Sequence, residues 1–182
     1  MAIEDLPAEL RIVKSFADSV DVESAQDDFD SPARFGRWLV AHGFDHPEPT
    51  ADELALAIAM RGALRDELIA HHGGTDSGEA RSRLDAYAER VPLRAAFGPG
   101  PATLVPVGAG VREMLGRVLA AMVLAEHDGT WQRVKICRED TCQVVFFDRS
   151  KNQSKTWCSM GLCGNRNKTR SYRERRRDTP AV

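Results

Sequence analysis

The residues best suited to chemistry in this chain are its four cysteines, which form two pairs with the same spacing. Each pair has the form C-x4-C, and 15 residues separate the two pairs. Zn²⁺ imposes no geometry of its own and binds four thiolates in a tetrahedron with Zn–S distances of about 2.3 Å. The pairs therefore predict one structural zinc ion bound by Cys137, Cys142, Cys158 and Cys163.

Two disulfides are the alternative use of four cysteines. The N-terminal MAIEDLPAELR has acidic residues where a secretory signal is basic, and no apolar run approaches the ~18 residues of a membrane span. We therefore expect a cytoplasmic protein that makes no use of a membrane, in which thiols stay reduced. This expectation and the paired spacing favour metal. Four thiolates also leave no open position for catalysis, so we expect no enzyme.

The charge of the chain is divided unevenly along its length. Residues 131–182 hold 13 Lys and Arg and 5 Asp and Glu, a net charge of +8, whereas residues 1–130 carry −10. Such asymmetry is typical of an acidic domain joined to a module that binds a polyanion. The alternative is that the two halves attract each other.

The segment after the last cysteine predicts a helix over residues 164–177 with a basic face. At 100° per residue, Arg166, Arg170, Arg173 and Arg177 lie within about 60° of one another. Like charges at i, i+4 repel by roughly 0.2–0.5 kcal/mol each, and a phosphate backbone would explain why they are kept. Base contacts would fall to Asn167, Lys168 and Arg170. The predicted nucleic-acid contacts are Arg166, Asn167, Lys168, Arg170, Arg173, Arg176 and Arg177, with Lys151 and Lys155 extending the surface.

The elements that must position these residues follow from periodicity and capping signals. Helices are expected over residues 5–20, 31–42, 50–71, 79–89 and 111–127. Residues 21–30 are expected to be irregular, and residues 93–107 to form a β-hairpin. Ser31 and the Thr50/Glu53 capping box mark two helix starts, and Gly43 and Gly129 mark two ends. On the third helix we expect Leu54, Ile58, Leu64 and Leu68 to face inward.

The cysteine-rich segment predicts a treble-clef zinc finger. We expect a strand over residues 131–136, then a cysteine pair, and then strands over residues 144–148 and 154–157. The last cysteine would begin the basic helix, where the helix dipole stabilises thiolates. Five histidines lie at predicted helix ends or loops, and we expect them to cap carbonyls rather than bind metal. They are His42, His46, His71, His72 and His127.

The stretch CREDTCQVVFFDRSKNQSKTWCSMGLCGNRNKTRSYRERRR resembles the CGNR zinc finger of bacterial proteins that join it to an N-terminal ABATE domain. That family is regarded as stress-induced transcription regulators, and the resemblance covers about residues 31–177. It implies zinc on the four cysteines and a supporting role for Asn165 and Arg166. The chain departs from the family at Gln143, where many members have glycine, and at residues 13–19, which lack a Leu-Asp-x-x-Asn-Thr pattern.

Together these observations predict an α+β protein: a mostly helical N-terminal domain with a β-hairpin (residues 1–129) and a C-terminal treble-clef zinc finger (residues 130–182). We expect a zinc-dependent DNA-binding transcription regulator whose N-terminal domain senses a small-molecule effector or mediates assembly as a homodimer. The alternatives are a zinc-stabilised protein–protein interaction module and an RNA-binding protein, in which Trp157 and Tyr172 could stack on bases.

Overall fold

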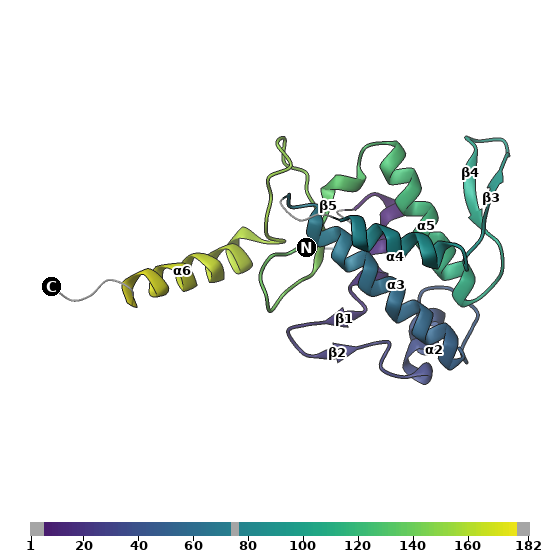
Figure 1. Ribbon diagram of the computed structural model, residues 1–182, viewed down its shortest axis with the longest axis horizontal. Coiled ribbons are helices and arrows are strands. Elements are labelled where there is room, and N and C mark those ends of the chain that lie inside the picture. The colour runs from purple at the N-terminus through teal and green to yellow at the C-terminus, as the bar shows by residue number, and fades with distance from the viewer. Residues whose placement is uncertain (1–5, 74–76, 178–182) are drawn as a thin grey trace.

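The computed structural model describes residues 6–73 and 77–177 as a helical body with small antiparallel hairpins (Figure 1). The helices are α1 (Arg11–Ala17), α2 (Pro32–Ala41), α3 (Ala51–Ala70), α4 (Gly78–Ala88), α5 (Val111–His127) and α6 (Asn165–Arg177). The strands pair as β1 (Val20–Asp21) with β2 (Gln26–Asp27), β3 (Leu93–Ala96) with β4 (Thr103–Pro106), and β5 (Val134–Ile136) with β6 (Val145–Phe147). The predicted α+β class is confirmed.

Helix boundaries fall where the capping residues place them. The Ser31 hydroxyl accepts a hydrogen bond from the Arg34 amide at the start of α2. Thr50 and Glu53 form the reciprocal capping box of α3, so the first amides of both helices have partners. After α2 and α5 the chain turns at Gly43 and Gly129, with φ of +83° and +77°, values that glycine adopts without a steric penalty.

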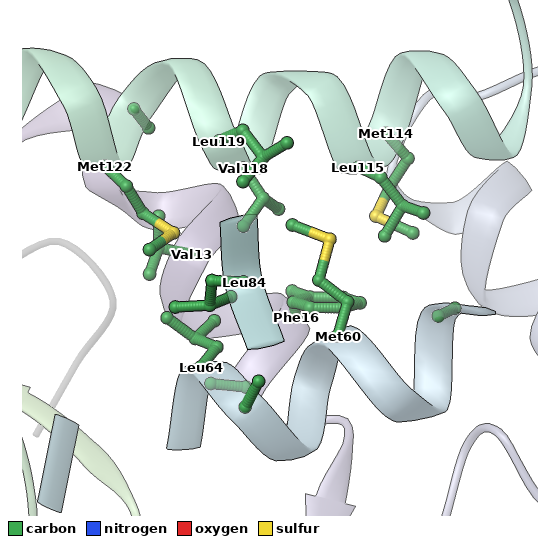
Figure 2. Close-up of a cluster of buried hydrophobic side chains, with 14 of the residues drawn as sticks. Val13, Phe16, Met60, Leu64, Leu84, Met114, Leu115, Val118, Leu119 and Met122 are labelled. Atoms are coloured by element: carbon green, nitrogen blue, oxygen red, sulfur yellow. The ribbon is translucent and has the colours of Figure 1, made fainter. Parts of the chain in front are cut away.

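The core lies between α1, α3, α4 and α5 (Figure 2). On α5, Leu115, Val118 and Met122 are buried against α1 and α3. On α3 the prediction is wrong for Ile58, whose side chain is 41% exposed. The labelled core residues of Figure 2 are Val13, Phe16, Met60, Leu64, Leu84, Met114, Leu115, Val118, Leu119 and Met122. No helix in the described ranges is long and apolar enough to cross a membrane.

Three local predictions are wrong. Residues 21–30 are mostly turns but not wholly irregular, because Asp21, Gln26 and Asp27 belong to the β1–β2 hairpin, whose turn Asp21 closes by accepting hydrogen bonds from the Glu23 and Ser24 amides. Residues 131–133 form a 3₁₀ turn before the strand begins. Residues 154–157 form no strand, and β6 pairs with β5 instead.

The β5–β6 hairpin belongs to the same core as the helices. Trp131, Val134, Ile136 and Val145 are buried in the main hydrophobic cluster, whereas the cysteines form a second, small cluster around Phe146. The predicted boundary between residues 129 and 130 stays a prediction. After the cysteine cluster, α6 extends away from the helical body, at the opposite end of the molecule from the β3–β4 hairpin (Figure 1).

Candidate metal centre and basic helix

The four cysteines gather at one point between β5 and α6. Their sulfur atoms all lie within 4.8 Å of one another. The Sγ atom of Cys158 is 3.7 Å from that of Cys142 and 3.7 Å from that of Cys163. Four sulfurs about 2.3 Å from a zinc ion in a tetrahedron would be about 3.8 Å apart. The donor set and its spacing therefore fit one structural zinc ion, with Cys137 as the fourth ligand.

The thiol pKa values of this cluster differ widely, and they show that the four cysteines do not all ionise without a cation. Burial raises the pKa of the Cys163 thiol to about 12, and the hydrogen bond that Cys158 donates to Cys137 raises the pKa of Cys158. The same hydrogen bond lowers the pKa of Cys137 to about 5. Four thiolates this close together repel one another unless a cation balances them, which is the charge that zinc supplies when it is bound.

The first cysteine pair sits on a tight backbone loop between β5 and β6. The Cys142 and Gln143 amides both donate to the Glu139 carbonyl, at 2.8 and 3.2 Å, and the Cys137 amide donates to the Val144 carbonyl at 2.9 Å. Gln143 closes the loop with φ of +48°, a left-handed conformation that glycine would take more easily. The departure from the family pattern is therefore accommodated at a backbone cost.

The second pair lies where the CGNR string begins α6. Cys163 and Gly164 belong to a single π-helical turn, and the Ser159 hydroxyl accepts a hydrogen bond from the Leu162 amide at its start. A Cβ atom on Gly164 would lie 2.8 Å from the Met160 sulfur, so a larger residue here would displace the end of the Met160 side chain. The Asn165 side-chain NH₂ donates to the Gly161 carbonyl at 3.0 Å and links the turn to the helix.

A buried carboxylate fixes α6 to the first cysteine loop. Glu139 is 2% exposed and accepts hydrogen bonds from Asn167 at 2.7 Å and from the Arg170 guanidinium at 3.0 Å. Arg170 also lies 3.7 Å from Asp140. Two residues predicted to read bases thus hold the helix in position.

The other predicted contacts divide into engaged and free cations. Arg166 forms an ion pair with Glu23 at 3.0 Å, and the Lys155 amine packs 5.3 Å from the centre of the Phe146 ring. Lys151, Lys168 and Arg173 are exposed and form no ion pair among the described residues. Arg176 is also exposed and stacks 5.8 Å from the Tyr172 ring centre. The side chain of Arg177 lies outside the described residues.

Comparison with family models matches both parts of this arrangement. A CGNR zinc finger model matches residues 133–176. The ABATE model, described as "Putative stress-induced transcription regulator", matches residues 10–141, which is most of the chain. The chain belongs to the ABATE family. The resemblance proposed from the sequence is confirmed, and a comparison with curated proteins gave no match.

In this ABATE protein, polar side chains of the helical body bind the backbone of the zinc-finger hairpin. His71 and His72, at the end of α3, contact the Val134 and Ile136 carbonyls at 2.6 and 2.5 Å. Burial lowers the pKa of both histidines, so each is neutral at pH 7 and donates one ring N–H. The predicted capping role is wrong for this pair, because the carbonyls belong to another element.

The opposite strand of the hairpin is held from α1. The Lys14 ammonium donates to the Val145 carbonyl at 2.7 Å, and the Asp18 carboxylate accepts from the Val145 amide at 2.8 Å. Lys14 and Asp18 also form an ion pair with each other. Lys14 and Asp18 lie in residues 13–19, the segment that lacks the family's Leu-Asp-x-x-Asn-Thr pattern. No sequence signal predicted their contacts with the hairpin.

Gln143 links α3 to the cysteine loop, and its replacement by glycine tests that link. The Arg65 guanidinium donates to the Gln143 side-chain oxygen at 3.0 Å, and the Gln143 side-chain NH₂ donates to the Asp140 carbonyl at 3.1 Å. Glycine relieves about 1 kcal/mol of backbone strain but loses two hydrogen bonds worth about 2 kcal/mol together. We therefore expect Gln143→Gly to lower the unfolding free energy by about 1 kcal/mol, measured by urea denaturation.

The control for this change is Gln143→Ala, which loses the same hydrogen bonds but keeps the backbone strain. It should be less stable than Gln143→Gly by about 1 kcal/mol. A Gln143→Gly protein more stable than the unmodified chain would show that the contact with Arg65 contributes little.

Proposed function

We propose that this protein is a zinc-dependent transcription regulator that binds duplex DNA through α6. The carrying observation is that α6 is held near its start, where Asn167 and Arg170 bind Glu139 beside the zinc-site cysteines, and then extends away from the body (Figure 1). Its exposed cations Lys168 and Arg173 have no ion pair among the described residues. A zinc-positioned helix with unneutralised charge is suited to phosphate contacts, which release counterions.

The shape of α6 favours DNA over RNA. Its 13 residues span about 20 Å at 1.5 Å per residue, and a helix about 10–12 Å wide fits the major groove of B-form DNA. The major groove of A-form RNA is too deep and narrow for side chains to read. The exposed Lys151, on the loop between β6 and the second cysteine pair, would reach a flanking phosphate.

The residues assigned to this interface differ in role. Lys168, Arg173 and Arg176 would contact phosphates or base edges, because they are exposed along α6. Asn167 and Arg170 would act by holding the helix on Glu139. The zinc ion would be structural, since four sulfur ligands leave no position for a substrate, and we expect no catalytic activity.

The helical body would sense an effector or mediate assembly as a homodimer. An open groove between α1, α5 and β4 supports the first role. Ile12, Phe44 and Leu104 line it, and so does Arg117, which stacks 5.0 Å from the Phe44 ring centre. The Arg117 guanidinium is already paired with Glu113, so the mainly apolar walls suit a small, largely apolar effector.

Salt dependence of binding tests the DNA assignment. The affinity for a fluorescent duplex should fall steeply with salt, and the log–log slope should decrease by about 1 for each phosphate contact removed in Arg173→Ala or Lys168→Ala. Arg90→Ala removes an exposed arginine from the end of α4 and should leave the slope unchanged. A flat salt dependence, or equal slopes in all four proteins, would contradict DNA binding through α6.

The second candidate is a protein-interaction module, and the ion pair between Arg166 and Glu23 favours it. This contact shows that the basic helix accepts a carboxylate of the acidic half at 3.0 Å. An acidic protein partner would bind α6 in the same way. To separate the two candidates, the same salt titration is repeated with a fluorescent acidic peptide in place of the duplex. Tighter binding of the peptide than of the duplex would favour the protein-interaction module.

A further inference from the structure

The β1–β2 hairpin is an acidic arm with a firm base. Asp27 accepts two hydrogen bonds from the buried Arg61, at 2.7 and 2.6 Å, and the Asp28 amide donates to the Ser19 carbonyl at 2.8 Å. The Arg61 guanidinium also stacks 4.6 Å from the centre of the Phe29 ring, in the core. The hairpin is thus fixed to the helical body.

The tip of the arm presents a carboxylate in a defined position. The Asp21 side chain accepts hydrogen bonds from the Glu23 amide at 2.9 Å and from the Ser24 hydroxyl at 2.7 Å, and these bonds lower the pKa of Asp21. Asp21 therefore stays ionised and shapes the turn. Glu23 points outward from this turn and reaches Arg166 at 3.0 Å.

Arg166 is the first arginine of the basic face, and it lines a shallow groove along α6. Leu162, Arg170 and Arg173 line the same groove. A carboxylate and a phosphodiester are both oxygen anions that a guanidinium binds in the same geometry. The Glu23 carboxylate therefore occupies a position on Arg166 that a phosphate would take.

We propose that the β1–β2 hairpin is an intramolecular phosphate mimic, which covers Arg166 and competes with DNA for the groove of α6. This inference rests on the proposed DNA binding. DNA must displace Glu23 from Arg166 before Arg166 can join Arg173 in contacting phosphates. Both side chains are about half exposed, so the contact is weak enough to open: such pairs are worth about 0.2–1 kcal/mol.

A double-mutant cycle on DNA affinity tests the mimic. Four proteins are compared with one fluorescent duplex at one salt concentration: the unmodified chain, Glu23→Gln, Arg166→Gln and the double variant. Glu23→Gln should tighten binding about two- to five-fold. In the Arg166→Gln background, Glu23→Gln should have no effect, because the group that it covers is gone. Glu48→Gln, an exposed change on the loop before α3, controls for lost negative charge.

Equal gains from Glu23→Gln in both backgrounds would indicate general repulsion of DNA and would overturn the mimic while leaving DNA binding intact. Failure of all four proteins to bind DNA would overturn the proposed function and the competition with it. A measurement without DNA identifies the contact directly: the Arg166 Nε–Hε signal in ¹⁵N NMR should shift in Glu23→Gln but not in Glu48→Gln. An unchanged signal would also overturn the mimic.

Discussion

Replacing Cys163 by serine is expected to unfold more than the zinc finger. Structural zinc contributes on the order of 10 kcal/mol to the folding of small metal-binding modules, and a ligand set of three sulfurs holds it less tightly. The hairpin that carries Cys137 buries Val134 and Ile136 in the same core as α1 and α3. We therefore expect Cys163→Ser to lose stoichiometric zinc and to lose several kcal/mol of unfolding free energy, of the order of 5.

Two measurements check how far the loss extends. Zinc content is measured on the purified protein, and hydrogen exchange is measured on the amides of α1 and α3. Thr141→Ser is the control, because it changes the same cysteine loop while all four thiols remain. If α1 and α3 keep full protection in zinc-free Cys163→Ser, the helical body folds independently of the finger.

Replacing Asp148 by asparagine is expected to be the most damaging single change outside the cysteines. Asp148 is fully buried and accepts hydrogen bonds from the Lys135 ammonium at 2.9 Å, the Ser150 hydroxyl at 2.6 Å and the Lys155 amide at 2.9 Å. Lys135 is itself 3% exposed, so removing the carboxylate leaves a buried unpaired charge. Such a loss costs about 3–5 kcal/mol.

The pH dependence of the same group gives a second readout. Burial opposes ionisation of Asp148, but the hydrogen bonds from Ser150 and Lys135 prevail and lower its pKa to about 2. A depressed carboxylate pKa stabilises the fold above the unfolded value of about 3.9, and this stabilisation is lost as pH falls from about 4 towards 2. In Asp148→Asn this part of the acid transition should disappear.

Urea denaturation between pH 2 and 7 measures both effects. Asp45→Asn is the matched control, since Asp45 is exposed on the loop after α2. It should lie within about 0.5 kcal/mol of the unmodified chain. An Asp148→Asn protein as stable as this control would show that Lys135 finds water when the carboxylate is absent.

The parts of this fold that the sequence predicts depend on residues close together in the chain. Capping at Ser31 and Thr50 and turns at Gly43 and Gly129 depend on residues a few positions apart, and the structure confirms them. The paired cysteines were equally visible, because tetrahedral sulfur coordination constrains spacing strongly. The helix boundaries that caps and glycines mark, and the metal centre, therefore followed from the sequence.

The joint between the finger and the body could not be predicted, because its contacts are distant in sequence. Lys14 and Val145 are 131 positions apart, and neither belongs to a recognisable motif. For the same reason the segment 154–157 was expected to pair as a strand. The buried carboxylate of Asp148 accepts hydrogen bonds from the Ser150 hydroxyl and the Lys155 amide, so this segment bonds to a side chain instead of forming a strand.

The basic helix shows a further limit of periodicity. A helical wheel places Arg166 and Arg170 on one face but does not show which of them is already neutralised. In the fold, Glu23 and Glu139 take these two cations, and both acids come from outside α6. The charge available for a partner is therefore smaller than the composition of the helix indicates.

The side chains that bind β5 and β6 also close the edges of a two-stranded sheet. An uncovered strand edge offers unpaired amides and carbonyls to other chains and promotes aggregation. Here Lys14 and Asp18 take both outward groups of Val145, and His71 and His72 take the outward carbonyls of β5. The finger is thereby protected against edge-to-edge pairing, and weakening these bonds would expose a template for self-association.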